Sequence, residues 1–354
     1  MNVVGTFAPG ATELPYRWQS LAGKTLLVTG AAGFIGGALF QRLAGYGLDV
    51  IGTVLYPHEA ETLRAAGHKA ELLDLASEKS WDGLLDGVDI VFNIAAMFQE
   101  TEQSDEAYRQ VNHIGALKLA EAAARAGVKR FVHCSTVGVH GHVKEIPATE
   151  LTPYNPMDVY HQTKLDGELA ILDFGRGLAD DGMVVTVNRP AMVYGPGDLR
   201  MLKLFKTIAS GRFRMIGSGD TLAHLGYIDD QTDSFLLSAT APREAVHCEA
   251  FNIASDRPIT LNDLAAEIAR YSNVELARTH IPLGPVWLAG LICEGLCKPV
   301  SVKPPLSRRR VGFFTHDRAF DLSKARERLG YESHVDTATG VARTIQWYRE
   351  NGFL

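Results

Sequence analysis

A tyrosine and a lysine four residues apart carry the most reactive chemistry in this sequence. Tyr160 and Lys164 have the spacing that places a phenol and an amine on one face of a helix. A phenol is a poor base at neutral pH because its ordinary pKa is about 10. A neighbouring ammonium stabilises the phenolate, so the pair can exchange a proton with a substrate hydroxyl. A surface helix can carry the same pair without any function, so the pattern needs support from elsewhere.

Two hydroxyl residues supply that support. Ser135 and Thr136 stand at the end of the apolar run RFVHCS, which is typical of a strand. In a doubly wound parallel sheet, ligands bind at the carboxyl edge of the strands. A hydroxyl at that edge can donate a hydrogen bond to the reacting oxygen and orient it.

A glycine-rich turn follows the first expected strand. The run TGAAGFIG places Gly30, Gly33 and Gly36 between an apolar strand and a helix. In a βαβ unit these glycines permit a tight turn, close approach of a pyrophosphate and close packing of helix on strand. The first N–H groups of the helix then hold the phosphate charge. The turn predicts a dinucleotide site formed by Gly30, Ala32, Gly33, Phe34, Ile35 and Gly36.

The residue that usually selects NAD is missing. NAD enzymes place an acidic side chain at the end of the second strand, where it binds the ribose hydroxyls. Here that position is near Val54, and no arginine follows it for a 2′-phosphate. The choice between NAD and NADP is open.

Short apolar runs alternate with longer helical patterns from Lys24 to Asn188. Such alternation predicts a doubly wound parallel sheet with helices on both faces, the Rossmann arrangement. After Pro190 the alternation stops, which indicates a smaller, mixed substrate domain. We expect an extension over residues 1–20, a dinucleotide domain over 21–190 to which later segments return, and a mainly substrate-binding domain over 191–354. The expected strands are Thr25–Thr29, Val50–Leu55, Val88–Ile94, Arg130–Ser135 and Met183–Asn188, and the expected helices are Phe34–Ala44, Ala116–Ala126, Leu261–Tyr271 and Ser323–Leu329.

Composition excludes several classes of function. Of the 354 residues, 46% are hydrophobic and 21% are charged, which is ordinary for a globular protein. The net charge of −6 argues against a general nucleic-acid binder, because such proteins carry an excess of basic residues. The four cysteines fit no zinc spacing, so we expect no metal and a reducing compartment. No signal peptide is evident, and the apolar stretch Ile281–Cys293 is too short to span a bilayer. A cytoplasmic location is expected.

Taken together, TGAAGFIG, HCSTVGVHG and YHQTK make the chain resemble the extended short-chain dehydrogenase/reductase superfamily, over roughly residues 24 to 350. The resemblance implies hydride transfer with NAD or NADP, with Tyr160 as acid/base and Lys164 lowering its pKa and holding the ribose. It also implies a homodimer. Thr136 takes the place of the catalytic Ser/Thr, with Ser135 as the less favoured candidate, and Asn112 matches the fourth active-site residue. Further cofactor contacts are implied at Asp74, Leu75, Ala95, Ala96, Pro190 and Val193, and substrate contacts at Met97, Val137, Arg309 and Arg310.

Departures from the family pattern bear on the reaction. Val137 and Gly138 stand where the 4,6-dehydratases carry an Asp-Glu pair, so dehydration is disfavoured. Ala223-His224-Leu225 replaces the Arg-Asp-Phe with which many nucleotide-sugar epimerases pair a diphosphate, although Arg309, Arg310 or Arg318 can supply a cation. The apolar segment 282–310 resembles the 3β-hydroxysteroid and sterol-4-carboxylate dehydrogenase branch. The ending Lys324–Gly352 is similar to that of bacterial sugar epimerases.

Three functions are therefore weighed. The first is an NAD(P)-dependent nucleotide-sugar epimerase or ketoreductase, which the overall spacing and the C-terminal ending favour slightly. The second is a 3β-hydroxysteroid or sterol-type dehydrogenase, which performs the same first half-reaction and releases a ketone. The third is a non-catalytic NAD(P)-sensing protein, which is disfavoured because such proteins usually lack the tyrosine or the lysine.

Overall fold

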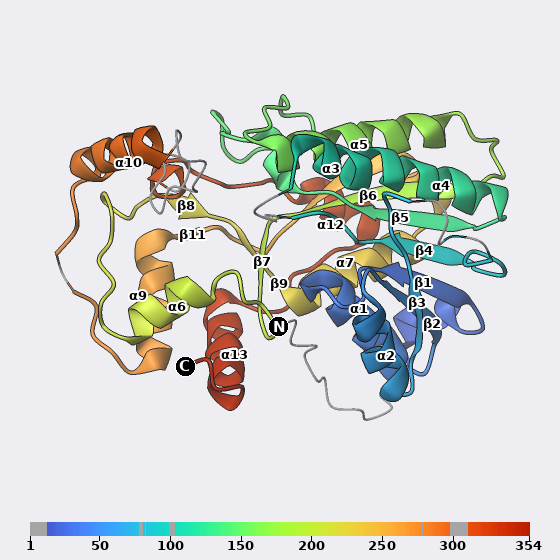
Figure 1. Cartoon of the computed structure of the whole chain (residues 1–354), viewed down its shortest axis with the longest axis horizontal. Coiled ribbons are helices and arrows are strands. Elements are labelled where there is room, and N and C mark those ends of the chain that lie inside the picture. The colour runs from blue at the N-terminus through green and yellow to red at the C-terminus, as the bar shows by residue number, and fades with distance from the viewer. Residues whose placement is uncertain (1–12, 78–80, 82, 99–102, 278, 298–310) are drawn as a thin grey trace.

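The structure is a computed structural model that describes residues 13–77, 81, 83–98, 103–277, 279–297 and 311–354 (Figure 1). The expected substrate contacts Arg309 and Arg310 lie outside the described residues.

A parallel sheet of seven strands forms the larger part of the molecule, in the order β10-β6-β5-β4-β1-β2-β3. The expectation of a doubly wound Rossmann sheet is confirmed. Its strands are β1 (Thr25–Thr29), β2 (Asp49–Val54), β3 (Lys69–Leu72), β4 (Ile90–Asn93), β5 (Arg130–Cys134), β6 (Val184–Pro190) and β10 (Glu249–Ile253). All pair in parallel, so their carboxyl ends share one edge.

Helices cover both faces of this sheet (Figure 1). One face carries α1 (Phe34–Gly45), α2 (Pro57–Ala65) and α7 (Ile228–Thr240), and the other carries α3 (Asp105–Arg109), α4 (Ala116–Arg125) and α5 (Val159–Arg176). Successive side chains of a strand point to opposite faces, so Leu26 and Val28 join the core under α1 while Leu27 joins the core under α4. Both faces of the strands are buried, which explains their nearly continuous apolar sequences.

The described part of the N-terminal segment packs on this domain. Trp18 and Leu21, in the short 3-10 helix η1 (Tyr16–Leu21), are each 1% exposed and belong to the core that contains α1 and α7. Arg17 adds an ion pair to Asp233 of α7 at 3.2 Å. The sequence indicated no role for this segment, and in the structure it buries a tryptophan.

A smaller lobe forms from later residues around its own apolar core. It contains β7 (Met192–Tyr194), β8 (Leu222–Ala223), β9 (Leu225–Tyr227) and β11 (Ile259–Thr260), in two two-stranded sheets. Its helices are α6 (Leu202–Ala209), α9 (Leu261–Ser272), α10 (Leu283–Cys297) and α13 (Thr337–Glu350). The chain returns to the main sheet through α7, β10, the short α8 (Arg243–Val246) and α12 (Ser323–Leu329).

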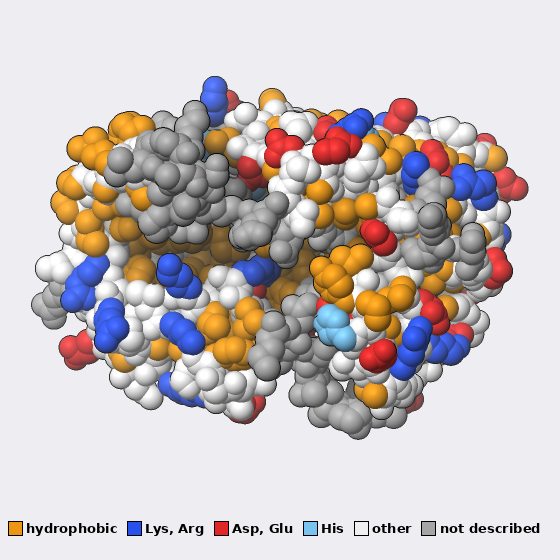
Figure 2. Space-filling view, in the orientation of Figure 1, with side chains coloured by type: hydrophobic (Ala, Val, Ile, Leu, Met, Phe, Trp, Pro, Cys, Tyr) orange, Lys and Arg blue, Asp and Glu red, His pale blue; other side chains and the backbone are white. Residues whose placement is uncertain are grey.

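Helix α10 is apolar on its exposed surface. Trp287, Leu288 and Ile292 are 46%, 52% and 54% exposed, and the orange side chains at the upper left of Figure 2 lie over this helix. None of its side chains belongs to the core clusters of the described residues. No helix among the described residues is both long enough and apolar enough to cross a membrane.

Candidate active site

The turn between β1 and α1 depends on its glycines. Gly30 has a φ of +71°, and a Cβ there would lie 3.1 Å from Cα of Ala95. A Cβ on Gly36 would lie 2.3 Å from the carbonyl oxygen of Gly30, so only glycine lets the first turn of α1 pack so closely on the end of β1. Gly33 caps α1 without a side chain, which leaves the first N–H groups accessible to an anion. These residues fit the dinucleotide that the sequence predicts.

The end of β2 bears no carboxylate that is free for a ribose. Leu55 and Tyr56 are 51% and 53% exposed there, and the Tyr56 ring stacks on His58 with centroids 5.7 Å apart. The next carboxylate, Glu59, accepts the backbone N–H of Tyr56 at 3.4 Å as part of the cap of α2. The end of β2 therefore offers an aromatic and an apolar surface where NAD enzymes usually place an acid.

Helix α5 presents the tyrosine and the lysine at the carboxyl edge of the sheet. It begins after Asp158, whose carboxylate accepts the backbone N–H of His161 at 2.9 Å. Lys164, one turn after Tyr160, is 1% exposed. Burial lowers the pKa of Lys164, and the neighbouring Cys134 and Glu168 oppose that shift.

Tyr160 is held in a partly apolar setting. Its ring meets Phe98 edge to face, with centroids 4.9 Å apart. Burial raises the pKa of Tyr160 well above its ordinary value and Cys134 adds to the rise, while the guanidinium of Arg200 opposes it. Burial and Cys134 therefore favour the neutral phenol, while cationic charge near the ring favours the phenolate.

The hydroxyl residues after β5 lie in two different environments. Thr136 caps the 3-10 helix η4 (Val137–His140), accepts the Gly138 N–H at 3.1 Å, and is partly exposed. Ser135 is 3% exposed, and its hydroxyl has no hydrogen-bond partner among the described residues. Because a Cβ on Gly138 would lie 2.1 Å from the His161 ring, η4 packs directly against the start of α5. Thr136 therefore stands beside the helix that carries Tyr160.

Asn112 forms hydrogen bonds that connect its own helix with the segment at Met97 and with α5. It lies in the π-helix η3 (Gln110–Gly115), where its Oδ1 accepts the Met97 N–H at 2.8 Å. Its Nδ2 donates to the Met97 carbonyl at 3.0 Å and to the Thr163 hydroxyl at 3.2 Å. A Cβ on Gly167 would lie 2.2 Å from the Asn112 carbonyl oxygen, so α5 approaches η3 very closely. Asn112 thus fixes the Met97 backbone against α5.

The other predicted contacts are spread along the same edge. Ala95 and Ala96 follow β4, and the Ala95 N–H donates to the Thr29 hydroxyl at 2.8 Å. Asp74 follows β3, where its carboxylate accepts the Ala76 N–H at 2.9 Å. Two of the predicted contacts, Leu75 and Val137, are 6% and 8% exposed and pack in apolar clusters. A third, Pro190, is the last residue of β6. Val193 is buried in β7 and offers its carbonyl to Arg200.

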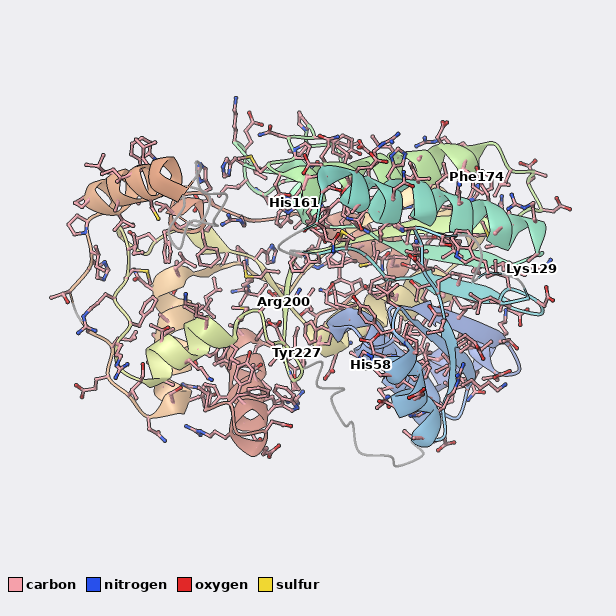
Figure 3. The ribbon with its side chains drawn as sticks, in the orientation of Figure 1. His58, Lys129, His161, Phe174, Arg200 and Tyr227 are labelled. Carbon is pink, nitrogen blue, oxygen red and sulfur yellow. The ribbon has the colours of Figure 1, made fainter. Side chains whose placement is uncertain are left out.

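Arg200 is a candidate that the sequence analysis did not single out. Its Nε donates to Asp198 at 2.7 Å and its Nη2 to the Val193 carbonyl at 2.7 Å. The guanidinium lies over the ring of Phe34 at 4.8 Å and within 5.7 Å of the Phe98 ring. It therefore stands between the glycine turn and Tyr160, near the centre of the molecule in Figure 3. The available signal was its position three residues after the run Tyr194–Gly197, whose sequence is YGPG. Arg318, the cation suggested earlier, donates instead to the carbonyls of Phe313 and His316.

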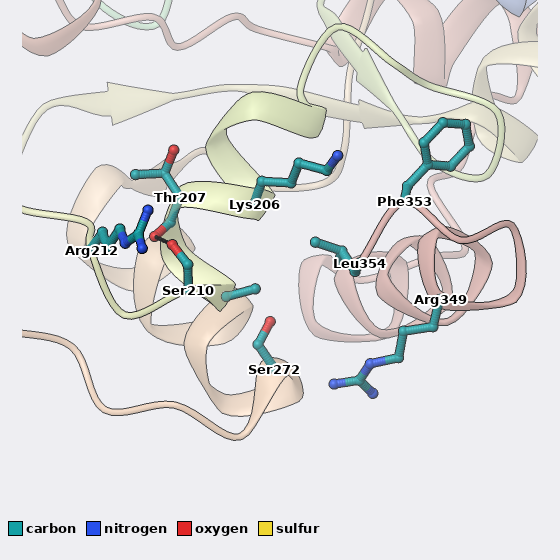
Figure 4. Close-up of a pocket in the computed structure, with 9 residues that line it drawn as sticks. Lys206, Thr207, Ser210, Arg212, Ser272, Arg349, Phe353 and Leu354 are labelled. Carbon is teal, nitrogen blue, oxygen red and sulfur yellow. Dashed lines mark hydrogen bonds between the residues drawn. The ribbon is translucent and has the colours of Figure 1, made fainter.

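A separate hollow of about 640 Å³ lies in the smaller lobe between α6, α9 and the C-terminal residues (Figure 4). It carries the cationic side chains of Lys206, Arg212 and Arg349. None of the predicted catalytic or cofactor residues lines it, so it is distinct from the edge that holds Tyr160.

The chain is similar to known proteins along most of its length. The model of the NAD dependent epimerase/dehydratase family matches residues 26–254. The chain is 30% identical to the UDP-glucose 4-epimerase of Mycolicibacterium smegmatis, over 91% of this chain and 98% of that protein. It is 27% identical to the 3beta-hydroxysteroid-dehydrogenase/decarboxylase isoform 1 of Arabidopsis thaliana, over 90% of this chain and 78% of that protein.

A solved structure is similar along nearly the whole chain. The UDP-glucose 4-epimerase of Thermotoga maritima, crystallised with UDP-glucose, superimposes with a TM-score of 0.73 at 26% identity and covers 92% of this chain and 99% of that one. The family model spans β1 to β10, which includes the glycine turn, the hydroxyl residues after β5 and the Tyr160–Lys164 helix. The chain is a member of the NAD dependent epimerase/dehydratase family, an enzyme of the extended short-chain dehydrogenase/reductase type.

Proposed function

We propose that the protein oxidises and reduces a secondary alcohol by hydride transfer with NAD or NADP, most simply as a 4-epimerase or ketoreductase of a nucleotide sugar. The observation that carries the reaction type is the placement of Tyr160 and Lys164 on one turn of α5, at the edge where the Gly30–Gly36 turn ends β1. A nicotinamide dinucleotide bound at that turn supplies the acceptor and donor of hydride.

The chain's own residues manage the proton. Tyr160 takes the proton of the substrate hydroxyl as the carbonyl forms and returns it when the carbonyl is reduced. Lys164 stabilises the phenolate, and Thr136 donates a hydrogen bond to the reacting oxygen. Val137 and Gly138 carry no carboxyl group, and Gly138 has no space for one beside His161. These residues favour reversible oxidation over elimination of water.

The nucleotide-sugar substrate rests on the relatives and on one cation. Two UDP-glucose 4-epimerases match nearly the whole chain, one by sequence and one by structure. Arg200 offers a guanidinium between Phe34 and Phe98, although the usual Arg-Asp-Phe is absent. Guanidinium groups are well suited to pair with diphosphate oxygens.

A second candidate, a 3β-hydroxysteroid or sterol-type dehydrogenase, is favoured by helix α10. A lobe that binds a charged nucleotide has little need for a helix whose exposed side chains include Trp287, Leu288 and Ile292. Figure 2 shows a hollow with apolar side chains in its walls below this part of the lobe. A relative named as a hydroxysteroid dehydrogenase/decarboxylase also covers 90% of the chain.

The deciding experiment is mass spectrometry of the small molecules that copurify with the protein, followed by turnover assays. A nucleotide sugar interconverted with its epimer, without net change in cofactor absorbance, supports the first candidate. Net cofactor reduction by a hydroxysteroid supports the second and refutes the first.

In either case Tyr160→Phe is expected to lower kcat at least about 100-fold while leaving cofactor binding within about twofold, because only the proton transfer is removed. Full turnover by Tyr160→Phe would refute the assigned role and favour a non-catalytic NAD(P)-binding protein.

A further inference from the structure

A chain of four buried polar side chains runs along the carboxyl edge of the sheet to the catalytic lysine. The Thr29 hydroxyl, at the end of β1, lies 3.1 Å from Oδ1 of Asn93 at the end of β4. Nδ2 of Asn93 lies 3.1 Å from Nδ1 of His133 in β5, and Nε2 of His133 lies 3.5 Å from Nζ of Lys164. Thr29, Asn93 and His133 are 0% exposed and Lys164 is 1% exposed. Bulk solvent therefore does not reach these four side chains.

The backbone sets the direction of the first hydrogen bonds in this chain. The Thr29 oxygen already accepts the N–H groups of Ile94 at 2.9 Å and Ala95 at 2.8 Å. Its own proton must therefore go to Asn93, which makes the Asn93 oxygen the acceptor and turns the amide nitrogen toward His133. An amide nitrogen can only donate, so Nδ1 of His133 must accept and carry no proton.

The remaining nitrogen of His133 then carries the ring proton and faces the lysine. Burial, with Lys164 nearby, lowers the pKa of His133 well below its ordinary value, so the ring is neutral and has one N–H. An ammonium has three donors and no acceptor, so it would meet this N–H donor to donor. A neutral amine accepts it.

We propose that His133 is a positioning residue for Lys164: its Nε2–H, fixed by Asn93 and Thr29, holds the lysine nitrogen and favours the neutral amine in the cofactor-free protein. The inference deepens the proposed function and rests on it for its catalytic meaning. Tyr160 and Lys164 then share one proton, either as phenol and amine or as phenolate and ammonium. When the phenolate takes the substrate proton, the tyrosine is again a phenol and the lysine holds the additional proton, so the pair as a whole is the base.

Other groups near the lysine contribute but do not replace this contact. Cys134 from β5 and Glu168 on α5 favour the ammonium, while burial opposes it. On the neighbouring strands, the side chains level with His133 are the uncharged Asn93 of β4 and Val187 of β6. Among these neighbours, His133 is the one whose hydrogen-bond direction favours one protonation state of Lys164.

The first test reads the histidine directly in the unaltered protein. With ¹⁵N-labelled histidine, NMR distinguishes a protonated from a bare imidazole nitrogen, and the His133→Gln variant assigns the signal. We expect Nε2 protonated and Nδ1 bare from about pH 6 to about pH 9, with no titration in that range. His224 is an internal reference, since its Nδ1 accepts the Phe320 N–H at 3.1 Å and its Nε2 faces the Ser255 carbonyl at 2.8 Å. A proton on Nδ1 of His133 would overturn the proposal.

The second test follows the titration of Lys164 by NMR of labelled lysine side chains in cofactor-free protein. We expect His133→Phe, and independently Thr29→Val, to raise the midpoint by about one pH unit, which is a tenfold change in the ratio of amine to ammonium at a given pH. Thr29→Val leaves His133 in place but allows the side-chain amide of Asn93 to exchange the positions of its oxygen and nitrogen. If His133 acts only through packing, the Lys164 midpoint of this variant should not shift. His224→Gln is the matched control and is expected to leave the midpoint unchanged.

An unmoved midpoint in folded His133→Phe and Thr29→Val would refute the role of His133. Thermal unfolding and NAD binding establish that each variant is folded. Neither test uses a substrate, so an absence of turnover would refute the proposed function without deciding the state of His133.

Discussion

The clash predicted at Gly36 offers a test of the glycine turn that needs no substrate. In Gly36→Ala the new Cβ would lie 2.3 Å from the Gly30 carbonyl oxygen, whereas real Cβ atoms keep at least 3.0 Å from such neighbours. The end of β1 and the start of α1 must therefore separate by about 0.7 Å. Gly45→Ala is the matched control, because the same substitution on the same helix meets nothing within 4 Å.

The two variants separate the clash from helix propensity. Replacing glycine by alanine in a helix contributes up to about 1 kcal/mol in both. Overpacking costs about 1–3 kcal/mol in Gly36→Ala alone. We therefore expect Gly36→Ala to unfold roughly 2–10 °C below Gly45→Ala in thermal scans, since about 1 kcal/mol corresponds to a few degrees for a protein of this size.

Cofactor binding is expected to change more than stability. A shift of the turn misdirects the N–H groups at the start of α1, and each hydrogen bond to a charged group contributes about 1.5–3 kcal/mol. The loss of one such bond weakens NAD binding about 10- to 100-fold. Calorimetric titration of both variants with NAD and NADP measures this directly. If Gly36→Ala binds both cofactors as tightly as Gly45→Ala and unfolds at the same temperature, the assignment of the pyrophosphate to this turn is wrong.

Three further predictions concern the protein's stability. Trp18→Ala is expected to lower the free energy of unfolding by about 3–5 kcal/mol in urea, because Trp18 is 1% exposed in the core of the dinucleotide domain. Arg189→Met is expected to cost about 3–5 kcal/mol by leaving the buried Glu168 carboxylate unpaired, and Arg189→Met combined with Glu168→Leu is expected to restore most of that loss. Burial, with Arg189 beside it, lowers the pKa of His140 to about 4, so between that value and about 6.5 the unfolded chain binds a proton that the native protein does not. Stability should therefore fall by up to about 3 kcal/mol as pH drops through this range, and the fall should be smaller in His140→Gln when both are unfolded in urea at each pH.

The local elements of the dinucleotide domain could be predicted because their signals lie in adjacent residues. The strand Thr25–Thr29 and the helix Ser323–Leu329 have the bounds that the sequence predicted, and the helix from Phe34 ends one residue later than expected. The strand β3 was not predicted, because Lys69–Leu72 is short and three of its four side chains are exposed. The strand β10 was not predicted either, since only its pairing with β6, far away in sequence, identifies it as part of the sheet.

The same distinction holds for the site. Tyr160, Lys164 and the glycines were found from spacing within one helix or one turn. Arg200 and His133 were not, because their significance depends on partners that the fold brings from elsewhere: Phe34 and Phe98 for Arg200, and Asn93 with Lys164 for His133. Within a strand such as RFVHCS a buried histidine is indistinguishable from a packing residue until its partners are known.

The polar contacts of α5 explain how the fold fixes Tyr160 in place. Along its buried side, Thr163 bonds Asn112 of η3, Lys164 lies against His133 of β5, and Glu168 pairs with Arg189 of β6. Apolar packing alone tolerates small slides and rotations of a helix, whereas directional bonds to three separate segments do not. An apolar pair in place of Arg189 and Glu168 can contribute as much to the free energy of unfolding as the ion pair does. The ion pair is therefore better explained by how it positions α5 than by its contribution to stability. The double variant should therefore stay folded yet turn over more slowly, since a displacement of about 1 Å at a reacting group can cost about 100-fold in rate.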